Sequence, residues 1–192
     1  MKKIHIRNLA LTGLFMSIGL VLPFLTGQIP EIGNMLLPMH IPVFLCALIC
    51  GWQYGLPMAF VLPLLRSLIF GMPPLYPTAL SMAFELATYA LVAGLLYGLA
   101  KKQNILTVYY SIIAAMIAGR LVWGAAQATF LGIGGKPFTF SAFLSGALLN
   151  AIPGIIIQLI LIPAVLFALD RSGLVPFKRP EKPEEETTET EE

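Results

Sequence analysis

Charged side chains are scarce in this chain, and most of its acidic residues lie at one end. Lys, Arg, Asp and Glu make up 11% of the 192 residues, against roughly 25% in an average soluble domain. Seven of the ten acidic residues fall within the last twelve positions. With 57% hydrophobic residues and a mean hydropathy of +0.83, the composition excludes an ordinary soluble domain and indicates an integral membrane protein.

The sequence also lacks the local motifs of several catalytic classes. It has no Gly-rich loop followed by Lys and Ser or Thr, which excludes a phosphate-binding loop for ATP hydrolysis. Neither His-Glu-x-x-His nor Gly-x-Ser-x-Gly occurs, and a tight turn explains the GIGG at 132–135. We therefore expect a protein that is not an enzyme and has no cofactor, metal or nucleic-acid partner.

Cysteine is nearly absent as well. Cys46 and Cys50 are the two cysteines, and they lie four residues apart in an apolar run, at the spacing of one helix face. A metal site would need further ligands, and the sequence offers none beside them. The pair therefore favours two buried thiols over a metal site.

What the chain has in abundance is long apolar runs, and we predict an all-α membrane protein with six transmembrane helices. Residues 39–71 together would form a helix of roughly 50 Å, too long for a hydrocarbon core of about 30 Å, so we divide them at Gly51, Trp52 and Gly55. The predicted spans are residues 5–26, 39–52, 54–71, 79–100, 105–131 and 141–169.

The basic residues give an independent test of this topology. With six spans, all three basic clusters fall on one side, and the positive-inside rule makes that side the cytoplasm, with both termini there. The clusters are Lys2, Lys3 and Arg7; Lys101 and Lys102; and Arg171, Lys178, Arg179 and Lys182. The outer connections are then 27–38, 72–78 and 132–140, rich in Gly, Pro and aromatic residues. We expect residues 1–170 to form the transmembrane domain and 171–192 to be a disordered acidic cytoplasmic tail.

Three ionisable residues lie inside the apolar runs: Arg66, Glu85 and Arg120. A charge at membrane depth is costly and persists only when it is paired, hydrated or functional. Counting about 1.5 Å per residue along each helix puts all three, with Asn150 of the last span, in one layer of the outer half. We expect a pocket there that opens to the outside. Three further polar residues would border it: Gln127, Gln158 and His40.

The charges in this layer do not balance, because two guanidinium groups face one carboxylate. Glu85 would pair with one arginine, either as a structural clamp or as part of a site, and Asn150 would bond a neighbouring helix or a ligand. The other guanidinium needs water, a backbone carbonyl or a ligand carboxylate, and Arg suits bidentate carboxylate binding. The sequence therefore predicts an anionic or zwitterionic ligand. For His40, a satisfied interfacial histidine and a ligand contact both remain open.

The first span carries small residues at helical spacing. Gly13 and Ser17 are four residues apart, with Ala10 nearby. Small residues at this spacing let another helix approach closely. Packing within the bundle and contact with a partner protein both remain open.

Taken together, the chain resembles the substrate-binding S components of energy-coupling factor transporters, the ABC-type importers of vitamins. The resemblance covers about residues 7–170 and looks closest to the branch that includes pantothenate carriers. It rests on six predicted helices in under 200 residues and on these segments: RNLALTG at 7–13, PMHIP at 38–42, PLLRSLIFGMPP at 63–74, AFE at 83–85 and GRLVWG at 119–124.

The resemblance implies a multi-pass protein of a prokaryotic plasma membrane that captures a vitamin from outside. Such carriers dock on a transmembrane coupling subunit that works with two cytoplasmic ATPases. Their first helix contacts the coupling subunit through an Ala-x-x-x-Ala motif, and Gly13 and Ser17 stand where the two alanines are expected. The outer connections would then form the gate.

Our leading hypothesis is thus a vitamin-binding S component, with pantothenate as the first guess. Arg66 or Arg120 would hold the ligand carboxylate, Glu85 would orient an arginine or accept a ligand hydroxyl, and Asn150 would contact an amide. The alternative is a self-contained secondary transporter or channel for a small solute. It is disfavoured because the inner half has almost no ionisable side chain.

Overall fold

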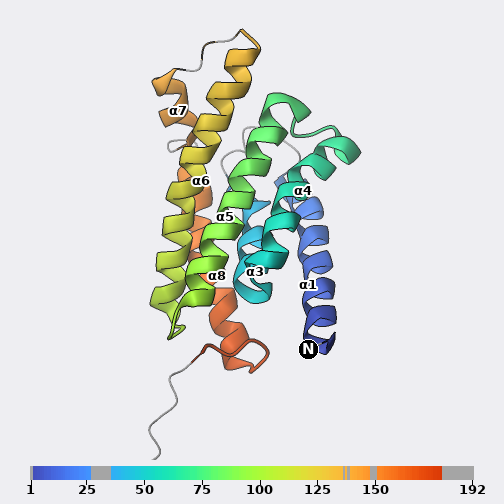
Figure 1. The fold of residues 1–192 in the computed structure, drawn as a ribbon, viewed down its shortest axis with the longest axis vertical. Helices are drawn as coiled ribbons and strands as arrows, with labels where there is room; N and C mark the ends of the chain where they lie inside the picture. Colours follow the sequence, from blue (N-terminus) through green and yellow to red (C-terminus); the bar gives the residue numbers. More distant parts are fainter. Residues whose placement is uncertain (1, 27–35, 136, 138, 148–150, 179–192) are drawn as a thin grey trace, which may run out of the picture.

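The computed structural model describes residues 2–26, 36–135, 137, 139–147 and 151–178, and these form helices joined by turns, without a strand. The helices run up and down beside one another (Figure 1). In chain order they are α1 (Lys2–Val21), the 3-10 helix η1 (Leu22–Thr26), α3 (His40–Cys50), α4 (Trp52–Phe70), the π-helical turn η2 (Leu75–Ala79), α5 (Leu80–Leu99), α6 (Ile105–Ile133), α7 (Phe140–Ala147) and α8 (Ile152–Arg171).

Five of the described helical segments are long and apolar enough to cross a membrane, and one further apolar helix is short. The short one is α3, with 11 residues. The chain does break at Gly51, as predicted, and this glycine has a φ of 93°, a value that residues with a Cβ rarely adopt. Figure 1 places the N-terminus, the α5–α6 connection and the end of α8 at the same end of the bundle. Six crossings with cytoplasmic termini remain a prediction that this arrangement fits.

The last predicted span differs from the structure. One helix was expected over residues 141–169, whereas the described residues form two, α7 and α8, on either side of residues 148–150, which lie outside the described part. The physical reason lies in Pro153, which stands in the first turn of α8. Proline has no N–H to bond a preceding carbonyl, so it suits the start of a helix better than its interior.

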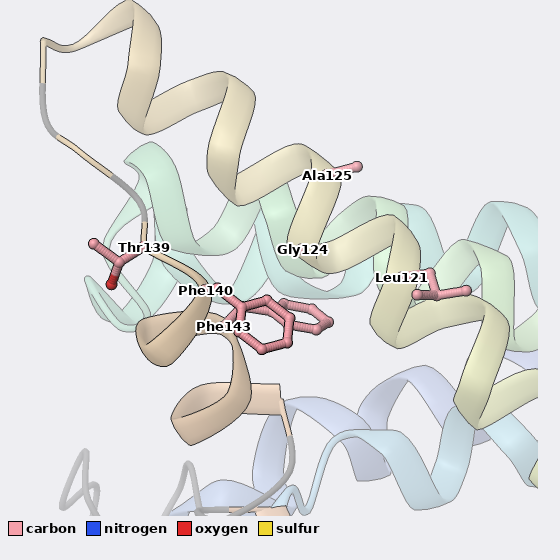
Figure 2. Close-up of a pocket in the computed structure, with 6 residues that line it drawn as sticks. All are labelled: Leu121, Gly124, Ala125, Thr139, Phe140 and Phe143. Atoms are coloured by element: carbon pink, nitrogen blue, oxygen red, sulfur yellow. The ribbon is translucent and has the colours of Figure 1, made fainter.

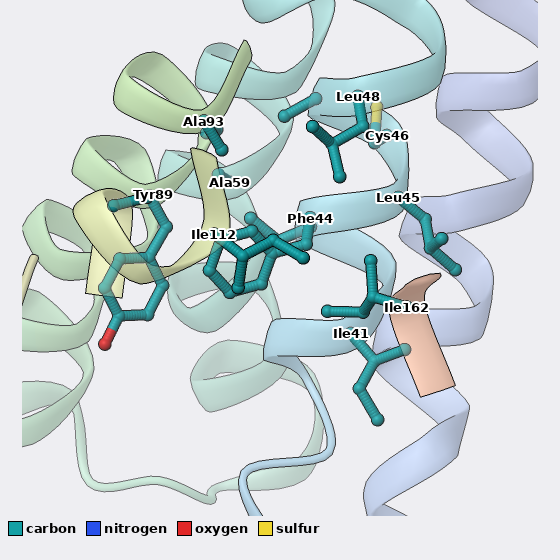
Figure 3. Close-up of a cluster of buried hydrophobic side chains, with 14 of the residues drawn as sticks. Ile41, Phe44, Leu45, Cys46, Leu48, Ala59, Tyr89, Ala93, Ile112 and Ile162 are labelled. Carbon is teal, nitrogen blue, oxygen red and sulfur yellow. The ribbon is translucent and has the colours of Figure 1, made fainter. Parts of the chain in front are cut away.

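The centre of the bundle is α3. Ten of its 11 residues are buried, and it packs against α1, α4, α5 and α8. Phe44 stacks on Tyr89 of α5, with ring centroids 5.1 Å apart. Figure 3 shows this core, in which side chains of α3, α5, α6 and α8 meet. Because α3 is enclosed by other helices, it has almost no surface to turn toward lipid.

Two glycines bring the neighbouring helices close to each other. A Cβ on Gly55 would meet the backbone of Ala47, and one on Gly94 would meet the backbone of Trp52. Backbones cannot shift as a side chain can, so these contacts require residues without a Cβ. They fix α4 against α3, and α5 against the start of α4.

The end of the bundle at which α1 begins, which the sequence predicts to be the inner end, contains the two cysteines and a C-terminal segment. Cys46 and Cys50 are free and buried, which confirms the prediction of buried thiols. After α8, residues 172–178 return to the α5–α6 connection, where the Lys178 N–H donates to Gln103 Oε1 and the Gln103 N–H donates to the Lys178 carbonyl. The predicted tail, 171–192, therefore begins with a segment that is bonded to the bundle, and residues 179–192 lie outside the described part.

Candidate functional site

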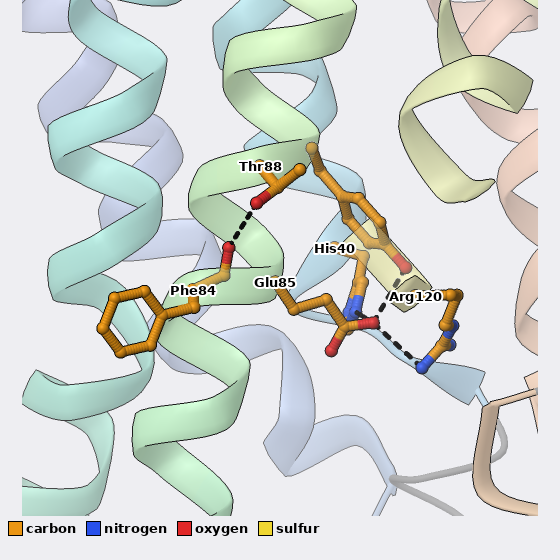
Figure 4. Close-up of polar contacts among 6 residues, drawn as sticks. His40, Phe84, Glu85, Thr88 and Arg120 are labelled. Atoms are coloured by element: carbon orange, nitrogen blue, oxygen red, sulfur yellow. Dashed lines mark hydrogen bonds and ion pairs between the residues drawn. The ribbon is translucent and has the colours of Figure 1, made fainter. Parts of the chain in front are cut away.

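A buried carboxylate is the centre of the polar cluster in this protein. Glu85 of α5 is 1% exposed, and three side chains converge on its Oε1 (Figure 4). Arg120 Nη1 of α6 lies 2.9 Å from this oxygen, and the Tyr89 hydroxyl donates to it at 2.8 Å. His40 Nε2, from the first residue of α3, is 3.8 Å away. Three helices thus contribute to one polar centre inside an apolar bundle.

Local sequence explains how these groups meet. Glu85 and Tyr89 are four residues apart on α5, so both side chains lie on one face of that helix. On α6, Gly119 precedes Arg120, and a Cβ at Gly119 would overlap the Tyr89 ring. The glycine therefore lets the tyrosine lie against α6 and reach Glu85. Sequence reasoning missed both Tyr89 and Gly119, although the four-residue spacing from Glu85 was a usable signal for the tyrosine.

Several buried donors of this region have no hydrogen-bond partner among the residues that the structure describes. They are Arg120 Nη2, Gln158 Nε2 and the two ring nitrogens of His40, one of which donates in the neutral ring. A buried polar group without a partner costs about 1–3 kcal/mol. Such donors are open to acceptors from water, from residues outside the described part or from a bound ligand.

Gln158 belongs to the same region. Its side chain is 1% exposed and lies in a buried stripe of α8, the helix that packs against α3 and α6. The stripe is Gly154, Gln158, Ile162 and Leu166. Depth is counted from Leu99 of α5, Ile105 of α6 and Arg171 of α8, at about 1.5 Å per residue. Glu85 is 14 residues from its helix end (about 21 Å), Arg120 is 15 residues away (about 22 Å), and Gln158 is 13 residues away (about 20 Å). This count gives Gln158 a depth similar to that of the Glu85–Arg120 pair, on a helix that packs against α3 and α6.

Arg66 has a different environment. Its Nη1 donates to the carbonyl of Leu20, at the outer end of α1. Its guanidinium lies over two aromatic rings, 5.1 Å from the centroid of Phe24 and 5.4 Å from that of Phe70. Of the partners left open by the sequence, the structure gives this arginine a backbone carbonyl. Arg66 thus ties α4 to α1 and η1, and Arg120 is the arginine that pairs with Glu85.

Of the remaining predicted site residues, Gln127 has a contact of its own away from the Glu85 cluster. Gln127 of α6 accepts a hydrogen bond from Ser81 Oγ of α5 at 2.7 Å, nearly two turns outward from Arg120. This bond joins α5 and α6 near their outer ends. Asn150 lies outside the described residues.

The comparisons with known proteins decide the family. Residues 7–166 match the family described as "ECF transporter, substrate-specific component", which is most of the chain. The chain belongs to this family. Searches of curated proteins and of solved structures find no significant match.

The family match confirms the coarser part of what the sequence predicted. As an S component, the chain is the substrate-binding subunit of an energy-coupling factor importer, a multi-pass membrane protein that works with partner subunits and is not itself an enzyme. The match names neither the substrate nor the pantothenate branch. Within the described residues, Glu85, Tyr89, Arg120 and His40 form a buried polar cluster, and this cluster is the candidate substrate site.

A hollow on the surface of the S component is a weaker candidate. It has a volume of about 270 Å³ and lies between α6 and α7 (Figure 2). The lining residues are Leu121, Gly124, Ala125, Thr139, Phe140 and Phe143. Thr139 is the single polar side chain among them, so the hollow offers little to recognise a polar solute.

The small residues of α1 face away from the bundle. Ala10, Gly13 and Ser17 are exposed, and a Cβ on Gly13 would meet no atom of the described part of the chain within 4 Å. Ser17 Oγ donates to the Gly13 carbonyl at 2.9 Å and so adds no contact to another helix. Of the two roles left open by the sequence, packing inside this bundle is therefore excluded for Gly13, and a surface for another protein remains.

Proposed function

We propose that this S component captures a small water-soluble vitamin bearing a carboxylate, with pantothenate as the first candidate, from the outer side of a prokaryotic plasma membrane. The observation that carries the proposal is a set of buried donors on Arg120, Gln158 and His40 that have no hydrogen-bond partner within the described ranges. Pantothenate offers a carboxylate, two hydroxyls and an amide, all of which present acceptors.

Within this proposal, Arg120 holds the ligand carboxylate. Its Nη1 is fixed by Glu85, which leaves Nη2 for the ligand. The contacts of Arg66 with Leu20, Phe24 and Phe70 favour Arg120 over Arg66 for this role. Glu85 orients the guanidinium through the 2.9 Å contact with Nη1. Asn150 supplies an amide contact, and Gln127 borders the path to the site.

The protein would take its energy from partners. We propose that it docks on a transmembrane coupling subunit served by two cytoplasmic ATPases, through the α1 face formed by Ala10, Gly13 and Ser17. Exposure of all three residues supports this role, because small residues let a second helix approach closely. The outer connections 27–38, 72–78 and 132–140 would close over the bound vitamin.

Binding titrations of the purified subunit test the ligand. We expect saturable binding of at least one carboxylate-bearing vitamin from a panel of pantothenate, nicotinate, biotin and folate. Arg120→Gln should weaken it about 10- to 100-fold, because a charge-assisted bond contributes about 1.5–3 kcal/mol. Arg7→Gln, at the exposed inner end of α1, is the matched control and should bind normally. No saturable binding of any of the four would refute the proposal, and uptake by liposomes containing this chain alone would favour the alternative of a self-contained transporter.

The docking surface has its own test. Gly13→Trp places a large side chain where a partner helix would approach, while a Cβ there meets no atom of the residues that the structure describes. We expect the variant to bind its vitamin normally and to lose co-purification with the coupling subunit. Val61→Trp, on the exposed face of α4, controls for added bulk in lipid. Undiminished co-purification of Gly13→Trp would place the docking surface elsewhere.

A further inference from the structure

His40 is the most unusual polar residue of the cluster. Its side chain is 1% exposed, its ring lies 5.4 Å from that of Tyr89, and neither ring nitrogen has a hydrogen-bond partner among the described residues. A neutral imidazole has one N–H donor and one acceptor nitrogen. In the described part of the chain, neither the donor nor the acceptor of His40 makes a hydrogen bond. The nearest charged group is Glu85, whose Oε1 is 3.8 Å from Nε2.

The charge balance around His40 restricts what the site can accept. Glu85 and Arg120 form an ion pair and cancel, so the cluster is neutral when His40 is neutral. A ligand carboxylate would then add an uncompensated negative charge at membrane depth, which is costly. A neutral ligand would add none.

The other titratable groups near this level do not supply the missing positive charge. From the helices packed on α3, they are Glu85 and Tyr89 of α5 and Arg66 of α4, with Arg120 on the adjacent α6. Arg66 is turned to Leu20, Phe24 and Phe70. Gln158 of α8 does not titrate, and the described charges of α1 and α8, such as Arg7 and Asp170, stand at the inner ends of their helices. His40 is thus the group in the cluster that is able to gain a positive charge.

We propose that an anionic ligand binds this site together with one proton, and that His40 carries the proton. This inference rests on the proposed function and specifies its substrate class as a monoanion taken up with one proton. The proton comes from solvent and forms a new N–H bond on the ring nitrogen that carries no hydrogen in the neutral imidazole. The ligand carboxylate stays ionised. Both ring nitrogens then donate, one toward Glu85 and the other toward the site, and the complex of Glu85, Arg120, His40 and ligand has no net charge.

Calorimetry with pantothenate and panthenol, its neutral alcohol analogue, tests the proposal directly. Titrations in phosphate and in Tris at pH 8, where an imidazole in water is neutral, give the number of protons taken up from the difference in apparent enthalpy. We expect about one proton for pantothenate and none for panthenol. Between pH 7 and 9, pantothenate affinity should fall by up to about tenfold per pH unit, and panthenol affinity should stay constant.

Variants assign the proton to a residue. His40→Gln should abolish proton uptake and weaken pantothenate at least about tenfold, while panthenol binding is retained, because an uncompensated charge remains. The other histidine of the chain, His5, is exposed and bonded to Tyr54, so His5→Gln is the matched control and should bind as the wild type does. Glu85→Gln leaves Arg120 uncompensated, and we expect this variant to bind pantothenate without proton uptake.

The outcomes separate this inference from the proposed function. If pantothenate, or another carboxylate vitamin of the panel, binds without proton uptake, or if His40→Gln still takes up the proton, the inference is wrong and the proposed function stands. If none of these vitamins binds, both are wrong. Proton uptake that disappears in His40→Gln and in Glu85→Gln but persists in His5→Gln supports the inference.

Discussion

Gly119 offers the sharpest test of the polar cluster, because its lack of a side chain is what admits Tyr89. A Cβ at this position would overlap the Tyr89 ring, whose hydroxyl donates to Glu85 at 2.8 Å. In Gly119→Ala the ring must move, and Tyr89 is 1% exposed with little room to do so. We therefore expect the substitution to break the bond to Glu85 and to strain the packing of α5 on α6.

The magnitude follows from these two effects. A hydrogen bond to a charged group contributes about 1.5–3 kcal/mol, and overpacking a core costs about 1–3 kcal/mol. A loss of about 3 kcal/mol or more in the free energy of unfolding corresponds to a midpoint roughly 6–12 °C lower for a chain of this size. Gly13→Ala is the matched control: its Cβ meets nothing, and alanine favours a helix by up to about 1 kcal/mol over glycine.

The buried cysteines supply the assay. Cys46 and Cys50 are free and buried, so a maleimide dye that fluoresces on reaction reports unfolding of the purified subunit in detergent. The double variant Gly119→Ala, Tyr89→Leu should recover part of the loss relative to the sum of the two single changes. If Gly119→Ala melts like the wild type, or if the two changes are additive, the Tyr89 ring does not lie against Gly119 and the reasoning fails.

Three further substitutions test other contacts. Arg66→Lys should lower the free energy of unfolding by about 1–2 kcal/mol, because lysine makes weaker contacts with the two aromatic rings. It should change pantothenate affinity less than about twofold. A large loss of affinity in titration would show that Arg66 belongs to the binding site. Asn104→Ala removes the side-chain cap on the Thr107 N–H at 2.8 Å and should cost about 1 kcal/mol in the same melting assay, with Asn104→Asp as the control that keeps the cap. Gln158→Leu removes a buried Nε2 donor that has no partner among the described residues, so it should raise the free energy of unfolding of the free subunit by about 1–3 kcal/mol. It should also lower vitamin affinity, and equal affinity would exclude Gln158 from the site.

Much of the fold was predictable because membrane helices can be recognised in a sequence as long runs of apolar residues. The apolar runs gave α1, α4, α5 and α6 to within a few residues, and the excessive length of 39–71 gave the break at Gly51. The division of the last span into α7 and α8 was missed, because the run of apolar residues continues through Pro153 and hydropathy does not distinguish one helix from two.

For the candidate site residues, the sequence predicted how deep each side chain lies in the bundle, but it did not predict toward which neighbouring helix the side chain points. Counting residues placed Arg66, Glu85 and Arg120 at similar levels, and the structure pairs two of them while the third faces α1. The side of a helix on which a residue lies depends on how the helices are rotated against each other, which packing decides. The contribution of Tyr89 was hidden for the same reason, since an aromatic residue in an apolar run reads first as core.

The enclosure of α3 has a consequence for how the protein is made. A segment of 11 apolar residues is too short to be released into the bilayer by itself, which takes about 20. α4 follows after a single residue, Gly51, and is 19 residues long. We therefore expect α3 to enter the membrane during synthesis only together with α4, as a helical hairpin. A nascent chain halted just after Cys50 should leave α3 outside the lipid, whereas one that extends past Gly71 should carry both helices in.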